Sequence, residues 1–400
     1  MTGPLGSLAR KASRLLGDVR HFTGRGRAHF ERVESVPHRV TVSGVRGKST
    51  VVQWLNEALV DRGLETYAKE TGNHPISYHN LDADEIEREG VTRLYENERE
   101  LADYWPVDAV VAENQGIREY TTRLANELFD PQVVVLLNVR RDHQSTLGAT
   151  LPDIARVFAR TVPEDAHVVS GDRNDAINGY LRREFEAQGI DFTVAKPDPD
   201  GPFVDVFGAR SALVVDEALR ILGLDPLSAE TIESLVTDLH SEWSWNRLRG
   251  GGLVANGAMM NDIESTELLR QYLVERLDDP TVTPFVFTRR DRAGRTAAFV
   301  HYVDWLTENG LAGRVHAAGS HAETFRRNVD AEVVTYDEES EVASATSESR
   351  AAGAARQSTA DAEQVLDACL DEGNPVYLVG NTVHDFMRDL EDVLADRTIE

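Results

Sequence analysis

The chain alternates short apolar runs with longer amphipathic segments from residue 38 onward. The apolar runs, which we predict to be strands, are 39–42, 107–112, 132–139, 167–169, 253–255, 285–288, 315–318, 333–335 and 376–379. Segments with apolar residues at helical spacing lie between them, for example 50–62 and 151–159. Strands that alternate with helices in this way are typical of a parallel α/β sheet.

The length of 400 residues exceeds one average domain, so we expect two. The stretch WSWNRLRGGG, residues 243–252, is the best boundary candidate because three glycines precede a new predicted strand. We predict a basic N-terminal segment at 1–37, a parallel-sheet domain at 38–246 and a smaller, Rossmann-like α/β domain at 247–400.

The net charge is −26, and only four of the 42 basic residues are lysines: Lys11, Lys48, Lys69 and Lys196. An acidic surface with arginine in place of lysine is typical of a halophile, and it excludes free nucleic acid as a partner. A single cysteine, Cys369, excludes an internal disulfide and a cysteine metal cluster. Its place on the apolar side of a predicted helix indicates a buried structural thiol.

The first forty residues carry eight basic and three acidic side chains, against the trend of the chain. Residues 5–19 are predicted to form a basic amphipathic helix. Such a helix either lies at an anionic membrane or docks on a membrane partner, or it packs on the acidic surface of the chain itself. The sequence has no apolar run of membrane-spanning length and no signal-peptide pattern. We therefore expect a cytoplasmic protein, with membrane attachment through this helix left open.

The stretch VTVSGVRGKST, residues 40–50, joins a predicted strand to a predicted helix through a glycine turn. Backbone N–H groups and the positive end of the helix would face phosphates there. Lys48 would reach the terminal phosphates of a nucleotide, and Ser49 or Thr50 would hold Mg²⁺. The glycine spacing, G-x-x-G-K-S-T, is shorter than in the common phosphate loop. The predicted nucleotide-binding residues of this loop are Gly44, Arg46, Gly47, Lys48, Ser49 and Thr50.

Two polar residues follow predicted strands of the same sheet. Glu113 ends the run that starts at residue 107, and His143 follows the run 132–139 in the segment LNVRRDH. Ligands of parallel sheets bind beyond the carboxyl ends of the strands, so these side chains should meet the loop. A carboxylate and an imidazole suit Mg²⁺ or Mn²⁺. We predict that Ser49, Glu113 and His143 bind metal.

The second predicted domain carries further candidates. The segment TRRDRAGR, residues 288–295, includes Arg289 and Asp291, and its arginines suit phosphates or a carboxylate-rich substrate. A solvated basic turn is the alternative. Asn261 and Asp262 precede a predicted helix, where Asp262 or Ser265 would serve as an N-cap.

The segment GVRGKST resembles the ATP-binding loop of the Mur ligase superfamily, amide-forming ligases that include the folylpolyglutamate synthases. With LNVRRDH, the chain looks most like the ligase subunit of bacterial and archaeal poly-γ-glutamate synthases. The resemblance covers residues 38–390. It departs from many Mur ligases in two respects. No lysine occurs in residues 144–169, where many of them carry a carbamylated lysine, and no N-terminal UDP-sugar domain precedes the loop.

The resemblance implies roles for several residues. Glu113 and His143 match the Glu and His that hold the metal between the γ-phosphate and the acyl phosphate, so that His143 is also a catalytic candidate. The segment KETGN, which contains Lys69 and Asn73, matches a segment beside the γ-phosphate and the reacting carboxylate. Lys48 and Lys69 are therefore catalytic candidates, and Asn73 joins the nucleotide site. Asn261 matches an Asn that contacts adenine.

The expected fold is thus a phosphate-loop parallel-sheet ATP-binding domain followed by a smaller Rossmann-like α/β domain, with a cleft that closes between them. The expected reaction is ATP-dependent amide formation through an acyl phosphate, with glutamate or a poly-γ-glutamate chain as substrate and ATP and Mg²⁺ or Mn²⁺ as cofactors. The resemblance also implies membrane subunits of a polymer synthase or exporter as partners. Two alternatives stay open: a γ-glutamyl ligase directed at folate or another cofactor, and a phosphate-loop ATPase or regulatory subunit without ligase activity. The sequence does not fix the oligomeric state.

Overall fold

The computed structural model describes residues 26–71, 75–86, 96–142, 144, 146–204, 206–336, 361–382 and 384–399. The chain divides into two compact units, Met1–Val236 and Thr237–Glu400. The amphipathic helix predicted at 5–19 lies outside the described residues, and the boundaries predicted at 37 and 246 stay predictions. In the described ranges no helix combines the length and apolar character needed to cross a bilayer.

Unit 1 is built on an eight-stranded sheet with the order β4-β3-β2-β5-β1-β6-β7-β8. Its strands are β1 His38–Ser43, β2 Thr66–Lys69, β3 Ile76–His79, β4 Asp82–Glu85, β5 Ala109–Glu113, β6 Val133–Leu136, β7 His167–Ser170 and β8 Phe192–Val194. The six strands from β2 to β8 in this order are parallel, whereas β3 and β4 form an antiparallel extension. The α/β fold class is confirmed.

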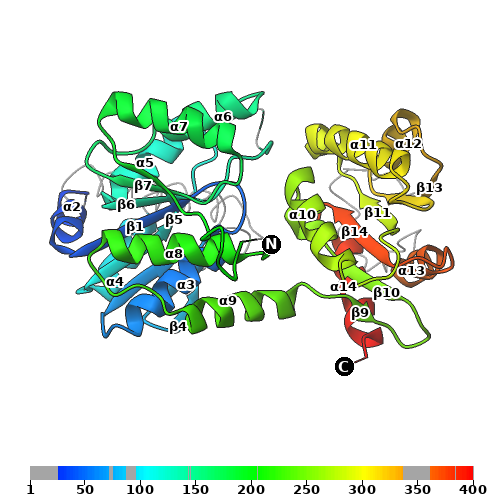
Figure 1. Ribbon diagram of the computed structural model, residues 1–400, viewed down its shortest axis with the longest axis horizontal. Helices are drawn as coiled ribbons and strands as arrows, with labels where there is room; N and C mark the ends of the chain where they lie inside the picture. The colour runs from blue at the N-terminus through cyan, green and yellow to red at the C-terminus, as the bar shows by residue number, and fades with distance from the viewer. Residues whose placement is uncertain are drawn as a thin grey trace, which may run out of the picture. The chain divides into compact units, whose positions relative to one another are not determined.

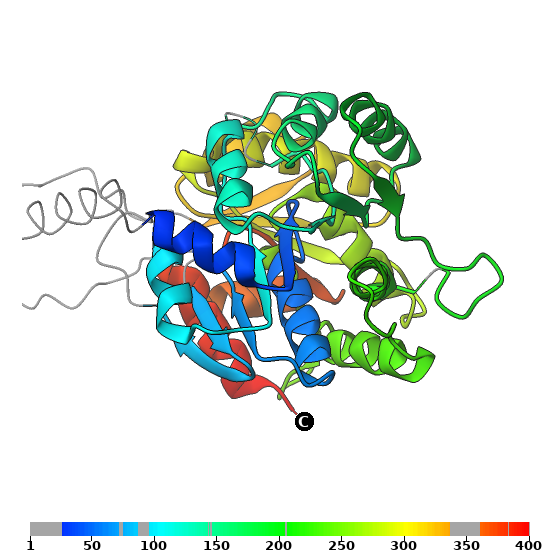
Figure 2. The ribbon, with the colours of Figure 1, turned by 90° about the vertical axis from the view of Figure 1, so that its left-hand side faces the viewer.

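Helices cover both faces of this sheet (Figure 1). They are α2 Gly26–Ser35, α3 Lys48–Val60, α4 Glu96–Tyr104, α5 Glu119–Phe129, α6 Leu151–Ala159, α7 Asp175–Gln188, α8 Ala209–Ile221 and α9 Ala229–Glu242, which runs across the division between the units. α3 and α8 lie on one face, and α5, α6 and α7 lie on the other, as both views show (Figure 2). The central strands β5 and β6 are buried along their whole length because helices cover both of their sides.

The register of the sheet brings three chain turns to one edge. Val42 of β1 pairs with Glu113 of β5, and Ser43 pairs with Leu136 of β6. Because the three strands are parallel, the segments that follow them leave the sheet at the same edge. The loop that follows β1, the carboxylate that ends β5 and the segment that follows β6 therefore lie together.

Unit 2 is built on a six-stranded sheet with the order β13-β12-β11-β14-β10-β9. Its strands are β9 Asn246–Arg247, β10 Leu253–Asn256, β11 Thr283–Phe287, β12 Val315–Ala318, β13 Val333–Tyr336 and β14 Val376–Gly380. Its helices are η2 Ala258–Met260, α10 Ile263–Val274, η3 Arg290–Arg292, α11 Ala293–Glu308, α12 Ala322–Asn328, α13 Ala362–Leu370 and α14 Asp385–Arg397. All strands except β9 are parallel.

The last strand, β14, inserts between β10 and β11, so the order of the strands reverses there. Such a reversal opens a crevice beyond the carboxyl ends of the strands. Cys369 is buried in α13, as predicted, and this burial raises the pKa of its thiol. The thiol is therefore a packing group of the unit 2 core.

Candidate active site

The loop between β1 and α3 has a conformation that requires glycine. Gly44 and Gly47 have φ angles of 120° and 79°, in the region that side chains disfavour. A Cβ atom on Gly44 would lie 3.0–3.1 Å from backbone atoms of Leu137 and Asn138. The loop thus packs directly on the backbone that follows β6, and α3 begins at its end with no side-chain cap on its first N–H groups.

The side chain of Asn138 holds this loop in place. Its Oδ1 accepts hydrogen bonds from the backbone N–H groups of Val45 (3.1 Å) and Arg46 (2.9 Å), and its Nδ2 donates to the Arg46 carbonyl (2.9 Å). The sequence singles out Asn138 only through the family resemblance. The amides of Val45 and Arg46 are engaged in this clamp, so the N–H groups from Gly47 onward are the part of the loop that is left to bind an anion.

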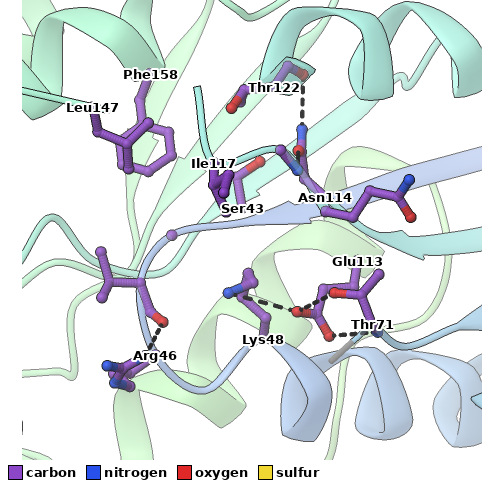
Figure 3. Close-up of a pocket in the computed structure, with 14 residues that line it drawn as sticks. Ser43, Arg46, Lys48, Thr71, Glu113, Asn114, Ile117, Thr122, Leu147 and Phe158 are labelled. Atoms are coloured by element: carbon purple, nitrogen blue, oxygen red, sulfur yellow. Dashed lines mark hydrogen bonds and ion pairs between the residues drawn. The ribbon is translucent and has the colours of Figure 1, made fainter. Parts of the chain in front are cut away.

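Three predicted residues meet at the start of α3, and Figure 3 shows two of them, Lys48 and Glu113. The Ser49 hydroxyl donates to Glu113 Oε2 at 3.0 Å, and Lys48 Nζ lies 3.5 Å from Glu113 Oε1. Thr71 adds two hydrogen bonds to the same carboxylate, from its backbone N–H (3.1 Å) and from its hydroxyl (2.9 Å). Glu113 is thereby fixed beside the loop, and Thr50 occupies the same first turn of α3.

Arg46 points toward the segment after β6. Its Nη2 lies 2.7 Å from Asp142 Oδ2 in a partly buried ion pair. The same segment is anchored by Asp172, a fully buried carboxylate that accepts the Val139 N–H at 2.6 Å. His143 and Asn73 lie outside the described residues, so their predicted roles stay predictions.

Lys69 is buried at the end of β2, with 1% of its surface exposed. Its ammonium pairs with Glu96 at 2.7 Å and donates to the side chain of Asn97, both in α4. Lys69 is therefore not a solvated loop charge. Lys69 does not line the cavity beside the loop that is described below. Its catalytic role stays a prediction.

Glu70, the residue after Lys69, is a buried carboxylate that the sequence analysis did not select. Its Oε1 accepts hydrogen bonds from the Tyr78 hydroxyl (2.5 Å) and from Gln53 Nε2 (2.8 Å). Burial raises the pKa of Glu70, and burial together with this hydrogen bond raises the pKa of Tyr78 to about 12. The only feature of the sequence that could have drawn attention to Glu70 is its position next to Lys69, one of the four lysines of the chain.

A cavity of about 110 Å³ opens between the loop and the segment that follows β5 (Figure 3). Its lining residues are Ser43, Gly44, Val45, Arg46, Lys48, Thr71, Glu113, Asn114, Gln115, Gly116, Ile117, Thr122, Leu147 and Phe158. The cavity thus combines two kinds of wall. Its charged side chains are those of Arg46 and Lys48 in the loop and of Glu113 at the end of β5, and its apolar side chains are those of Ile117, Leu147 and Phe158.

Two buried hydroxyls of this cavity, those of Ser43 and Thr122, have no hydrogen-bond partner within the described part of the chain. Ser43 is 3% exposed and Thr122 is 1% exposed. Nearby, Asn114 Nδ2 donates to the Thr122 carbonyl at 3.0 Å, and a Cβ on Gly116 would lie 2.3 Å from Thr122. The wall is therefore closely packed, and its two hydroxyls retain unused hydrogen-bonding capacity.

The candidates of unit 2 lie beyond the carboxyl ends of its strands. Arg295 Nη1 donates to the amide oxygens of Asn261 (2.6 Å) and Asn381 (2.7 Å), which follow β10 and β14. Arg289 and Asp291, which follow β11, form a bidentate pair with distances of 2.9 and 2.8 Å. Asp262 caps α10 through the Ser265 N–H, so the predicted N-cap is confirmed.

The described residues fit a divalent cation that takes part of its coordination from a nucleotide. Ser49 and Glu113 supply a hydroxyl and a carboxylate within 3.0 Å of each other. Mg²⁺ is usually bound by one or two carboxylates together with phosphate oxygens and water. No group of three or more His, Cys, Asp or Glu residues able to hold a metal occurs among the residues that the structure describes. The two described donors, Ser49 and Glu113, therefore suit a cation that takes further ligands from a nucleotide.

Sequence comparison finds relatives with a stated activity. Residues 246–397 match the family model of the poly-gamma-glutamate synthase CapB C-terminal domain. The chain is 26% identical over 312 residues to PGA synthase CapB of Bacillus subtilis (strain 168), and 29% identical over 313 residues to capsule biosynthesis protein CapB of Bacillus anthracis. Each match spans 69% of this chain, and the two matches span 74% and 62% of those proteins.

Solved structures share the fold over nearly the whole chain. The Escherichia coli FolC structure in complex with ADP has a TM-score of 0.63 at 15% identity, and the match covers 93% of this chain and 92% of that one. The bifunctional folylpolyglutamate synthase/dihydrofolate synthase of Yersinia pestis, complexed with AMPPNP and Mn, has a TM-score of 0.59 at 14% identity, with the same coverage. The predicted resemblance is thus confirmed: residues 246–397 match the CapB C-terminal domain, and the chain shares the fold of the folylpolyglutamate synthase structures.

Proposed function

We propose that this chain is an ATP-dependent, ADP-forming ligase that makes γ-glutamyl amide bonds through an acyl phosphate, in the synthesis of poly-γ-glutamate. The observation that carries the proposal is the meeting of Lys48, Ser49 and Glu113 at the glycine loop, with contacts of 3.0 and 3.5 Å. The names of the sequence relatives support the polymer product, and the nucleotides in the related structures support ATP.

The loop would bind the nucleotide through the N-terminus of α3 and through Lys48. The Lys48 ammonium pairs with Glu113 at 3.5 Å, a long contact that a phosphate oxygen can replace. Ser49 and Glu113 would hold the divalent cation, Mg²⁺ or Mn²⁺, which spreads the negative charge of the transferred phosphoryl group. Glu113 is kept in place by the two Thr71 hydrogen bonds, so the donors are ordered before the nucleotide arrives.

The acid substrate would enter the cavity beside the loop. The Ser43 and Thr122 hydroxyls can donate to carboxylate oxygens, and the apolar side chains of the wall, Ile117, Leu147 and Phe158, suit the methylene groups of a glutamyl unit. A carboxylate oxygen of this unit would attack the γ-phosphorus and release ADP. The amine of the next glutamate would then displace phosphate from the acyl phosphate, with loss of a proton from nitrogen.

Unit 2 would contribute the remaining groups of the predicted site. Asn261 is proposed to contact adenine, and Arg289 and Asp291 are proposed to contact the nucleotide. Arg289 is preorganised by its bidentate contact with Asp291 at 2.9 and 2.8 Å. The domain bounds 38–246 and 247–400 are part of the same proposal.

The chain is further proposed to act in the cytoplasm, with its basic N-terminal segment docked on membrane subunits of a polymer synthase or exporter. The excess of basic residues in the first forty positions motivates this. Deletion of residues 1–25 should release the protein from membranes that contain those subunits. Equal membrane recovery of the full and shortened chains would count against docking.

The ligase proposal is tested by supplying ATP, Mg²⁺ and glutamate, with and without the partner subunits, and measuring ADP release and amide product. Release that depends on glutamate supports it. Release that requires a pterin or cofactor acceptor would select the cofactor-directed ligase instead. Hydrolysis that ignores every added amino acid would favour an ATPase or regulatory subunit.

A further inference from the structure

Glu70 is held beside the phosphate loop by three structural elements. It follows β2, its Oε1 accepts from Gln53 of α3 at 2.8 Å, and the same oxygen accepts from Tyr78 of β3 at 2.5 Å. Its backbone N–H donates to the Ile76 carbonyl at 2.8 Å. Only 7% of the residue is exposed. A carboxylate fixed this firmly cannot turn away to solvent, so its position relative to the loop is set by the fold.

The Ser49 hydroxyl lies at the start of α3, close to two carboxylates. It donates to Glu113 Oε2 at 3.0 Å, and Gln53, one turn further along the same face of α3, donates to Glu70 Oε1 at 2.8 Å. A serine hydroxyl has one proton to donate and two lone pairs. In this structure the proton goes to Glu113, and Glu70 is the second carboxylate held beside this face of the helix.

The direction of this proton matters for a cation at Ser49. A hydroxyl binds a cation through a lone pair, so its proton must point to an acceptor away from the metal. If Glu113 also binds the cation, its oxygen is used by the metal and no longer suits the proton. Glu70 can then accept the proton, because both hydrogen bonds that hold it end on Oε1 and leave Oε2 for Ser49.

We propose that Glu70 is a positioning residue for the divalent cation: it accepts the Ser49 proton when the metal uses the Glu113 oxygen, and so aims the Ser49 lone pair at the cation. The inference rests on the proposed nucleotide and cation site but not on the identity of the acid substrate.

The test is the affinity of the full-length protein for Mn²⁺ in the presence of a non-hydrolysable ATP analogue, measured by electron paramagnetic resonance. Glu70→Gln should weaken Mn²⁺ binding by about 10- to 100-fold, the usual effect of removing a residue that orients a metal ligand. Binding of the analogue without a divalent cation should stay unchanged. Tyr78→Phe keeps the carboxylate but removes one of its anchors, and should weaken Mn²⁺ binding by less than Glu70→Gln.

Two controls separate positioning from a general loss of structure. Asp84→Asn removes a carboxylate that accepts from Tyr104 at 2.9 Å in the same unit, and should leave Mn²⁺ binding unchanged. Glu70→Gln should have no further effect in a Ser49→Ala background, because the two residues act through one hydroxyl. A folded Glu70→Gln variant with wild-type Mn²⁺ affinity would overturn the inference, as would an equal loss of cation-free analogue binding.

Failure of the proposed function gives a different result. A wild-type protein that binds Mn²⁺ and the analogue, loses Mn²⁺ affinity on Glu70→Gln, but shows no glutamate-dependent ADP release would support the inference and contradict the ligase. A wild-type protein that binds no Mn²⁺ with the analogue would overturn the inference itself.

Discussion

The start of α3 and the end of β2 each carry one of the four lysines of this arginine-rich chain, and the two lysines have opposite environments. Lys48 keeps 19% of its side chain exposed and approaches Glu113 only to 3.5 Å. Lys69 is 1% exposed and lies 2.7 Å from Glu96. Rarity of lysine drew attention to both positions, but only the tertiary contacts distinguish a cation that can reach a phosphate from one that is already neutralised inside the fold.

The largest expected effect comes from removing the buried cation. Lys69→Met leaves the Glu96 carboxylate without the ammonium it pairs with, and should lower the free energy of unfolding by about 3–5 kcal/mol. Urea unfolding measures this. The double variant Lys69→Met, Glu96→Gln should recover much of the loss, since both charges are then absent.

The same variant also tests the predicted catalytic role of Lys69. Glutamate-dependent ADP release per folded molecule should be compared with the wild type. A small change, next to a large loss of stability, would make Lys69 a structural residue. A loss of more than about tenfold in the folded fraction would favour the role that the family resemblance implies.

Lys48→Ala should act on activity and not on stability. We expect ADP release to fall by about 100- to 1000-fold, as for other groups that stabilise transition-state charge. The free energy of unfolding should stay close to the wild-type value because Lys48 is partly exposed and its ion pair is long. An unimpaired Lys48→Ala enzyme would contradict the whole nucleotide site.

Arginine substitutions sharpen the contrast between the two lysines. Lys69→Arg enlarges a buried side chain and should cost about 1–3 kcal/mol of stability. Lys48→Arg keeps the charge but replaces a point charge with a planar fork, so activity should fall between that of the wild type and Lys48→Ala. If both variants behave like the wild type, neither position requires the shape of a lysine side chain, and a positive charge alone is sufficient at both.

The smallest effect is expected in the cavity beside Lys48. Thr122→Val removes a buried hydroxyl without a described partner, so stability should stay equal or rise slightly. If the hydroxyl binds the acid substrate, KM for that substrate should rise by about 2- to 12-fold, equivalent to about 0.5–1.5 kcal/mol. An unchanged KM would remove Thr122 from the substrate site, and Leu269→Met, in α10 of unit 2, serves as a control of similar size.

Periodicity predicted the strongly patterned elements well. The strand 315–318 and the helix 151–159 have the predicted limits, because apolar residues at regular spacing define both. The run 132–139 is a strand only to residue 136, because the chain then turns so that Asn138 can clamp the loop. The short strand β4, Asp82–Glu85, was missed because its four residues are all exposed and show no apolar alternation.

The candidate site was predicted in part. The loop residues and Glu113 could be found because a glycine turn before a helix, and a carboxylate at a strand end, are local signals. Glu70 and the hydroxyls of Ser43 and Thr122 gave no such signal. The importance of Glu70 follows from its burial and from its hydrogen bonds to Gln53 and Tyr78, and that of the two hydroxyls follows from their burial beside the loop.

The sequence by itself determined the α/β alternation, the phosphate loop and the lysine that it presents, because these depend on contacts among residues a few positions apart. Only the tertiary structure decided that Ser49 and Thr71 bind the same carboxylate of Glu113, and that Lys69 is paired with Glu96 of α4. The physical reason is that parallel strands bring the ends of distant segments to one edge, where distance and burial fix each charge.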